Sequence, residues 1–129
     1  MGCDIHAVIE YREINTDYWQ AGAVLHLGRS YEIFCRVADC GRGGHPPLVA
    51  NRGLPTGLAI FNDVREDADH SYTWLTADEF SSAVQQAKED MGVDAHDWRY
   101  LPDYGAAVAM LRFLQTHTAE VRIVIGFDN

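Results

Sequence analysis

The first and last segments of the chain show the alternation of side chains that is typical of β-strands. In residues 3–12, one face carries Cys3, Ile5, Ala7 and Ile9. The opposite face carries Asp4, His6, Val8 and Glu10. Residues 121–127 are almost wholly apolar, which suits a central strand covered on both faces. We predict that the two strands pair antiparallel, so that the start of the first lies beside the end of the last.

The segment after the first strand predicts a hairpin and a short helix. A turn signal at residues 15–17 is followed by a second apolar run at residues 19–27, which would pair with the first strand. Apolar positions at helical spacing then predict a short helix near residues 30–40.

The middle of the chain is the least regular part. Residues 41–57 are rich in glycine and proline, which predicts a long irregular loop. Residues 58–69 are ambiguous and allow a helical turn around Ile60 and Phe61. Residues 71–75 are aromatic and suit a short strand.

Two longer helices follow. Thr76 and Glu79 have the spacing of a capping box, and the apolar positions after them keep helical spacing as far as Met91. Gly92 is a suitable residue to end this helix. Residues 103–117 predict a second helix with one apolar face.

These elements predict a single α+β domain over residues 1–129. We expect a mainly antiparallel sheet of three or four strands, packed by two or three helices. A chain of this length supports one hydrophobic core. The inner row of the sheet is expected to include Ile5, Ile9, Ile123 and Ile125.

Charge and composition narrow the classes of partner. The chain has 19 acidic and 10 basic residues, a net charge of −9. Nucleic acid is not expected as a partner, because its binding depends largely on neutralising phosphates with Lys and Arg. No stretch reaches the ~20 apolar residues of a membrane span, so no membrane is expected either. The three cysteines form no CxxC pair, which favours a cytoplasmic protein.

The terminal strands bring together the best candidate for a chemical site. Their alternation predicts that Asp4, His6 and Asp128 converge on one face of the sheet. A carboxylate and an imidazole at that spacing suit a divalent metal such as Zn, Mn or Fe, with Glu10 or His70 as a further ligand. The same carboxylate would alternatively orient the imidazole as a base. A third interpretation is that these residues simply face water at the strand ends.

Arginine and histidine residues extend this cluster to a possible ligand pocket. Arg52 lies in the glycine-rich loop, where backbone N–H groups and a guanidinium suit a phosphate group. The predicted ligand-binding residues are Asp4, His6, Arg29, Arg52, His70 and Asp128. The alternative for the arginines is a surface loop held by ion pairs. No P-loop or dinucleotide-binding fingerprint is present.

Five sequence motifs occur along the chain. It begins MGCDIH and ends FDN, and it carries R-x-Y-x-x-F at residues 29–34, RGLP at 52–55 and H-S-x-x-W-L-T at 70–76. In these motifs the chain resembles a family of small phage and prophage proteins, and the resemblance spans its whole length. The family has no assigned activity. The resemblance implies an accessory protein in the cytoplasm of the host cell, a class that includes factors that blunt host defences.

Three functions remain open at this point. The first is a binding protein for a small, phosphorylated ligand, acting as a counter-defence factor. The second is a metal-dependent hydrolase with Asp4, His6 and Asp128 as metal ligands and His70 as base. The third is an acidic protein inhibitor that covers a basic surface of a host enzyme. The ligand, the metal and the oligomeric state do not follow from the sequence.

Overall fold

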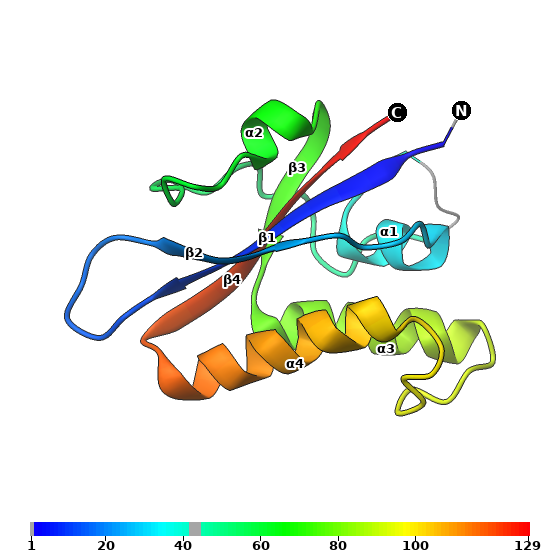
Figure 1. The fold of residues 1–129 in the computed structure, drawn as a ribbon. Coiled ribbons are helices and arrows are strands. Elements are labelled where there is room, and N and C mark those ends of the chain that lie inside the picture. Colours follow the sequence, from blue (N-terminus) through cyan, green and yellow to red (C-terminus); the bar gives the residue numbers. More distant parts are fainter. Residues whose placement is uncertain (1, 42–44) are drawn as a thin grey trace.

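A computed structural model describes residues 2–41 and 45–129 of the chain (Figure 1). The strands are β1 (Asp4–Arg12), β2 (Gln20–Leu25), β3 (His70–Leu75) and β4 (Glu120–Asp128). The helices are α1 (Tyr31–Val37), α2 (Val64–Asp67), α3 (Ala77–Asp90) and α4 (Pro102–His117). The strands form one antiparallel sheet in the order β2-β1-β4-β3, which confirms the predicted α+β class.

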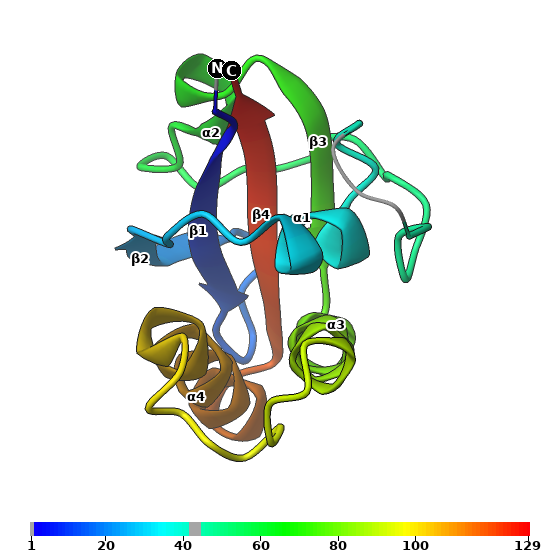
Figure 2. The same ribbon diagram turned by 90° about the vertical axis from the view of Figure 1, so that its right-hand side faces the viewer.

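The terminal strands occupy the centre of the sheet. β1 and β4 pair without interruption from Asp4 opposite Asp128 to Arg12 opposite Glu120. The start of β1 and the end of β4 therefore lie side by side, as Figures 1 and 2 show. The predicted pairing of these strands is confirmed, and its cause is the apolar character of both faces of β4.

One face of the sheet carries the main core. Figure 2 shows α1 lying across β4, with α3 and α4 beneath the sheet. The predicted inner row is buried there, together with apolar side chains of the three helices. The other face carries a smaller cluster, in which Val64 and Ala68 from the α2 region cover Val8 and Val124. Both faces of the central strands are thus covered.

The helices α3 and α4 begin close to where the sequence predicted. Thr76 and Glu79 form the complete capping box at the start of α3. Gly92 has a φ of +75°, in the left-handed region, and directly follows the C-cap of this helix. Pro102 takes the first position of α4, where the missing N–H of proline costs nothing.

Residues 58–69, which the sequence left ambiguous, contain the turn that it allowed and a short helix. Ile60 and Phe61 form a tight turn, and the short helix α2 begins only at Val64. The backbone N–H of Ala59 and the side chain of Asn62 both bind the buried Glu10 carboxylate, which holds the turn in place of a helix.

The predicted irregular loop is confirmed for Gly41 and residues 45–57, which contain neither helix nor strand. Residues 42–44 lie outside the described part of the chain. Within the described residues, no helix is long and apolar enough to cross a membrane.

Candidate functional site

A groove of about 490 Å³ lies on the face of the sheet that α2 covers. Val8 and Val24, which are direct neighbours on β1 and β2, belong to its apolar lining together with Val64 of α2. Its polar lining comes from Asp4, His6, His26 and Asp67. The groove therefore combines an apolar surface with several ionisable groups.

His6 and Asp128 form the best-defined polar contact at this groove. His6 Nε2 and Asp128 Oδ2 are 2.8 Å apart, although the two residues are separated by 122 positions. Both side chains are about one-third exposed. When the neutral imidazole donates from Nε2 to the carboxylate, its Nδ1 keeps a lone pair that can accept a proton. The pair can therefore act as a base oriented by a carboxylate.

A glycine opposite His6 allows the sheet and the α2 region to approach closely. Gly126 pairs with His6 in the β1–β4 register. A Cβ atom at position 126 would lie 2.7 Å from Cβ of Ala68 and 2.9 Å from Cδ1 of Tyr72. Only glycine leaves room for this contact, which fixes the wall of the groove beside His6.

Asp4 is engaged by an arginine. Arg29 donates from Nε to one carboxylate oxygen of Asp4 at 2.6 Å, and from a terminal nitrogen to the other at 3.2 Å. This hydrogen bonding lowers the pKa of Asp4 below its usual value. The carboxylate of Asp4 is thus already bound by a cation of the protein itself.

His70 lies on the opposite face of the sheet from His6. Regular alternation back from Trp74 would place His70 on the groove face, but the register shifts between His70 and Thr73. Ser71 has a φ of +59° within this bulge. The His70 ring consequently stacks on Phe127, at 6.3 Å between centroids, on the face of the main core.

Arg52 is also separate from the groove. It lies beside β3, where it donates to both carboxylate oxygens of Glu79 at 2.7 Å and to the carbonyl of Trp74 at 3.0 Å. Its guanidinium also lies 4.4 Å from the centre of the Trp74 ring. In this structure Arg52 joins the loop to the start of α3.

The predicted cluster is therefore divided. Asp4, His6, Arg29 and Asp128 lie together at one end of the central strands. His70 lies at the same end but on the opposite face, and Arg52 lies beside β3 at the start of α3. Glu10, considered as a metal ligand, is fully buried and paired with Arg122. Among residues 2–41 and 45–129, no three His, Cys, Asp or Glu side chains are grouped so that they could hold a metal ion.

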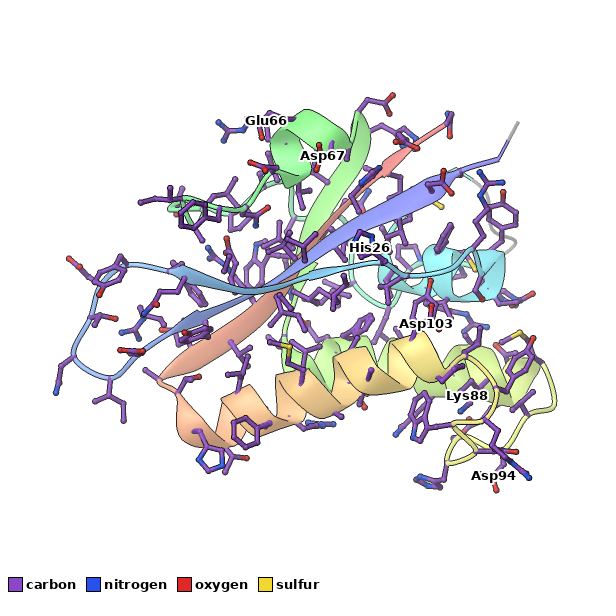
Figure 3. The ribbon with its side chains drawn as sticks, in the orientation of Figure 1. His26, Glu66, Asp67, Lys88, Asp94 and Asp103 are labelled. Carbon is purple, nitrogen blue, oxygen red and sulfur yellow. The ribbon has the colours of Figure 1, made fainter. Side chains whose placement is uncertain are left out.

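His26 is a groove residue that sequence analysis missed. It directly follows β2, and it shares a face with Val24, the partner of Val8. The last pair of this register is Ala7 with Leu25, and His6 and His26, the next residue on each strand, both line the groove. Figure 3 shows His26 at this end of β2 and Asp67 on α2. The available signal was the hairpin register, which places residues 24 and 26 on the face of residues 8 and 6.

Comparisons with protein-family models, curated proteins and solved structures each found no match.

The Arg52–Glu79 ion pair should make the free energy of unfolding depend on pH in the acid range. Hydrogen bonds from Arg52 lower the pKa of Glu79 from 4.5 to about 2. The ionised carboxylate therefore stabilises the fold fully above pH 4.5, and this contribution is lost as the pH falls toward 2. We expect the free energy of unfolding of Glu79→Gln to fall by about 1 kcal/mol less than that of the wild type when the pH is lowered. The difference is small because solvent screens a partly exposed pair.

Urea unfolding at neutral and acid pH measures this effect. The wild type should lose more stability on acidification than Glu79→Gln does. The matched control is Glu89→Gln, which changes an exposed glutamate of the same helix and should behave as the wild type. Equal acid sensitivity in all three proteins would contradict the assignment.

Proposed function

We propose that the protein binds a small organic ligand in the groove between β1, β2 and α2. The observation that carries this proposal is the His6–Asp128 pair beside an apolar surface, within a volume of about 490 Å³. Small-molecule sites typically have volumes of roughly 300–1,000 Å³, apolar walls and a few convergent polar groups. The groove has each of these properties.

The lining indicates the chemistry of the ligand. An apolar part would lie on Val8, Val24 and Val64, and a polar end would face His6 and His26. Three carboxylates, those of Asp4, Asp67 and Asp128, lie at the groove or beside it, and they outnumber the single guanidinium of Arg29. This balance favours a ligand that is neutral or positively charged at pH 7.

The phosphorylated ligand predicted from the sequence stays a prediction with weaker support. Arg52 holds Glu79 outside the groove, so phosphate recognition would fall to Arg29 and the two imidazoles. In the setting that the family resemblance implies, a phage accessory protein of this kind would sequester a small molecule of the host cell and thereby counter a defence.

A hydrolase is a second candidate, because the geometry of His6 and Asp128 favours base chemistry. A neutral imidazole with a carboxylate on Nε2 can take a proton from water through Nδ1. The metal-dependent form of this hypothesis has less support, since Arg29 engages Asp4 and His70 lies on the other face of the sheet.

Fragment titrations followed by amide NMR test the binding proposal. The probes are neutral and cationic ring compounds, inorganic phosphate and Zn²⁺, each added alone. We expect the ring compounds to shift the amides of His6, Val24 and Val64. Stronger shifts from phosphate would instead support a phosphorylated ligand. Shifts confined to other parts of the protein would contradict the proposal.

His6→Ala is the decisive variant. We expect it to fold with a stability loss of about 1 kcal/mol, because one partly exposed hydrogen bond is removed. Binding of a ring compound should weaken about tenfold, the equivalent of about 1.4 kcal/mol. His96→Ala, which changes an exposed histidine of the loop before α4, is the matched control and should bind as the wild type does.

Metal analysis of the same proteins separates the two candidates. Zinc that the wild type retains and His6→Ala loses would favour the metal-dependent hydrolase. A His6→Ala protein that is less stable but binds every probe normally would leave His6 with a structural role alone.

A further inference from the structure

The turn from Ala59 to Asn62 presents two large apolar side chains to solvent. Ile60 is 90% exposed and Phe61 is 78% exposed, the highest fractions among the large hydrophobic residues that the structure describes. The N–H of Asn62 closes the turn by donating to the carbonyl of Ala59 at 3.1 Å. We call Ile60 and Phe61 the apolar tip. In Figure 1 the loop that carries it, before α2, projects away from the sheet.

A buried hydrogen-bond network fixes the base of the apolar tip. One carboxylate oxygen of Glu10 accepts from the N–H of Ala59 at 2.7 Å and from the side-chain amide of Asn62 at 2.8 Å. The side-chain amide oxygen of Asn62, Oδ1, in turn accepts from the N–H of Val64 at 3.0 Å. Glu10 is fully buried and Asn62 is 5% exposed. The tip is therefore held away from the core on a rigid base.

The residue types at the tip are unusual for a turn. Gly, Pro, Asn, Asp and Ser dominate such positions because of their backbone properties. Here two large apolar residues take the centre of the turn instead. Rigidly presented aromatic and aliphatic side chains are effective binding anchors, because little conformational freedom is lost when a partner covers them.

The surroundings of the tip are acidic. Asp63, Glu66 and Asp67 follow it on and beside α2, and each is exposed without an ion pair among the described residues. Figure 3 shows Glu66 and Asp67 on this helix. Arg65 is the single basic residue between positions 63 and 69. The field of these carboxylates repels anionic lipid and nucleic acid and attracts a basic surface.

We propose that the apolar tip inserts into an apolar pocket of a protein partner whose rim carries Lys or Arg residues. The carboxylates of Asp63, Glu66 and Asp67 would then face this rim. The inference uses neither His6 nor Asp128, and its anchors Ile60 and Phe61 lie outside the ligand groove; Asp67 is the one residue that both proposals use. It gives the acidic-inhibitor hypothesis a definite contact surface.

Site-specific photocrosslinking locates the contact. A benzophenone amino acid replaces Phe61 in one protein and Phe113 in another, and each is irradiated in cells of the native host. Phe113 is the matched control, because it is an aromatic residue with 62% exposure on a different element, α4. The crosslinked protein is identified by mass spectrometry and purified for binding measurements.

We expect the protein labelled at position 61 to crosslink to one partner protein. The protein labelled at position 113 should not crosslink to that partner. The purified partner should bind the wild type in a salt-sensitive manner. Ile60→Ser and Phe61→Ser should each weaken binding roughly 30-fold, as expected for an interface anchor. Phe113→Ser should bind normally. All three variants should keep the melting midpoint of the wild type within a few degrees, since the changed side chains are exposed.

Four results would overturn the proposal. The first is crosslinking at position 61 no stronger than at position 113. The second is equal binding of the purified partner to the wild type and Phe61→Ser. The third is binding to phosphatidylglycerol vesicles that Phe61→Ser abolishes, which would make the tip a membrane contact. The fourth is self-association in sedimentation that Phe61→Ser abolishes, which would make it a contact between copies.

Discussion

Replacing Glu10 by alanine should lower the free energy of unfolding by about 3–5 kcal/mol, the usual cost of breaking a buried ion pair. Glu10 is fully buried, and Arg122, which donates to it at 2.7 Å, is 7% exposed. Removal of the carboxylate leaves the guanidinium buried, with the carbonyl of Gly57 and the ring of Trp19 as the polar and aromatic partners that the described residues still offer it. A domain of this size has about 5–15 kcal/mol in total, so the loss would be a large part of its stability.

The same substitution should also loosen the turn that carries the apolar tip. Glu10 accepts hydrogen bonds from Ala59 and Asn62, and both donors would lose their partner in a buried environment. Amide hydrogen exchange should therefore accelerate most around residues 57–64. Urea unfolding measures the loss of stability, and exchange measured in the folded protein shows where it acts.

An exposed ion pair at the other end of β1 is the natural control. Arg29 and Asp4 are each about half exposed, so solvent screens their interaction. Arg29→Ala should leave the urea midpoint close to that of the wild type. A Glu10→Ala protein as stable as Arg29→Ala would show that the buried network contributes little to the fold.

The pairing of the terminal strands was predictable because both strands are long and follow a strict period. Once Asp4 lies opposite Asp128, each step forward along β1 is a step backward along β4. The same register places Glu10 opposite Arg122. The buried ion pair was therefore predictable in principle, although the alternation alone suggested Glu10 as a metal ligand.

The positions of His70 and Arg52 were not predictable from alternation. The bulge at Ser71 reverses the face on which His70 lies, and a shift of one residue in a strand always has this effect. Serine, unlike glycine or asparagine, seldom adopts a positive φ, so the sequence gives no sign of the bulge at Ser71. Arg52 lies in an irregular loop, where no period relates its position to the sheet, and its partner Glu79 comes 27 residues later.

The groove itself required knowledge of the second face of the sheet. Sequence analysis placed His6 and Asp128 together, and the structure confirms their contact at 2.8 Å. The wall formed by α2 was missed, because a helix of four residues has too few positions to show a helical period. His26 was missed for a related reason: it lines the groove together with Val64 and Asp67 of α2, a helix that the sequence did not predict.

Deleting residues 121–129 should abolish cooperative folding altogether. This deletion removes almost all of β4, which pairs with both β1 and β3. It also removes four fully buried apolar side chains, those of Ile123, Val124, Ile125 and Phe127. Each contributes roughly 1.5–3 kcal/mol by its burial, so their sum alone approaches the entire stability of a small domain.

Circular dichroism during heating and the peak dispersion of amide NMR spectra measure this loss. The truncated chain should melt without a cooperative transition, because the strand that joins β1 to β3 in the sheet is missing. Deleting Asn129 alone is the control: this residue is exposed and lies outside β4, so the shortened protein should unfold cooperatively. A chain without residues 121–129 that kept a sharp melt near the wild-type midpoint would contradict the central placement of β4. Adding a synthetic peptide of residues 119–129 should restore dispersion, since the missing strand then re-forms both pairings from outside the chain.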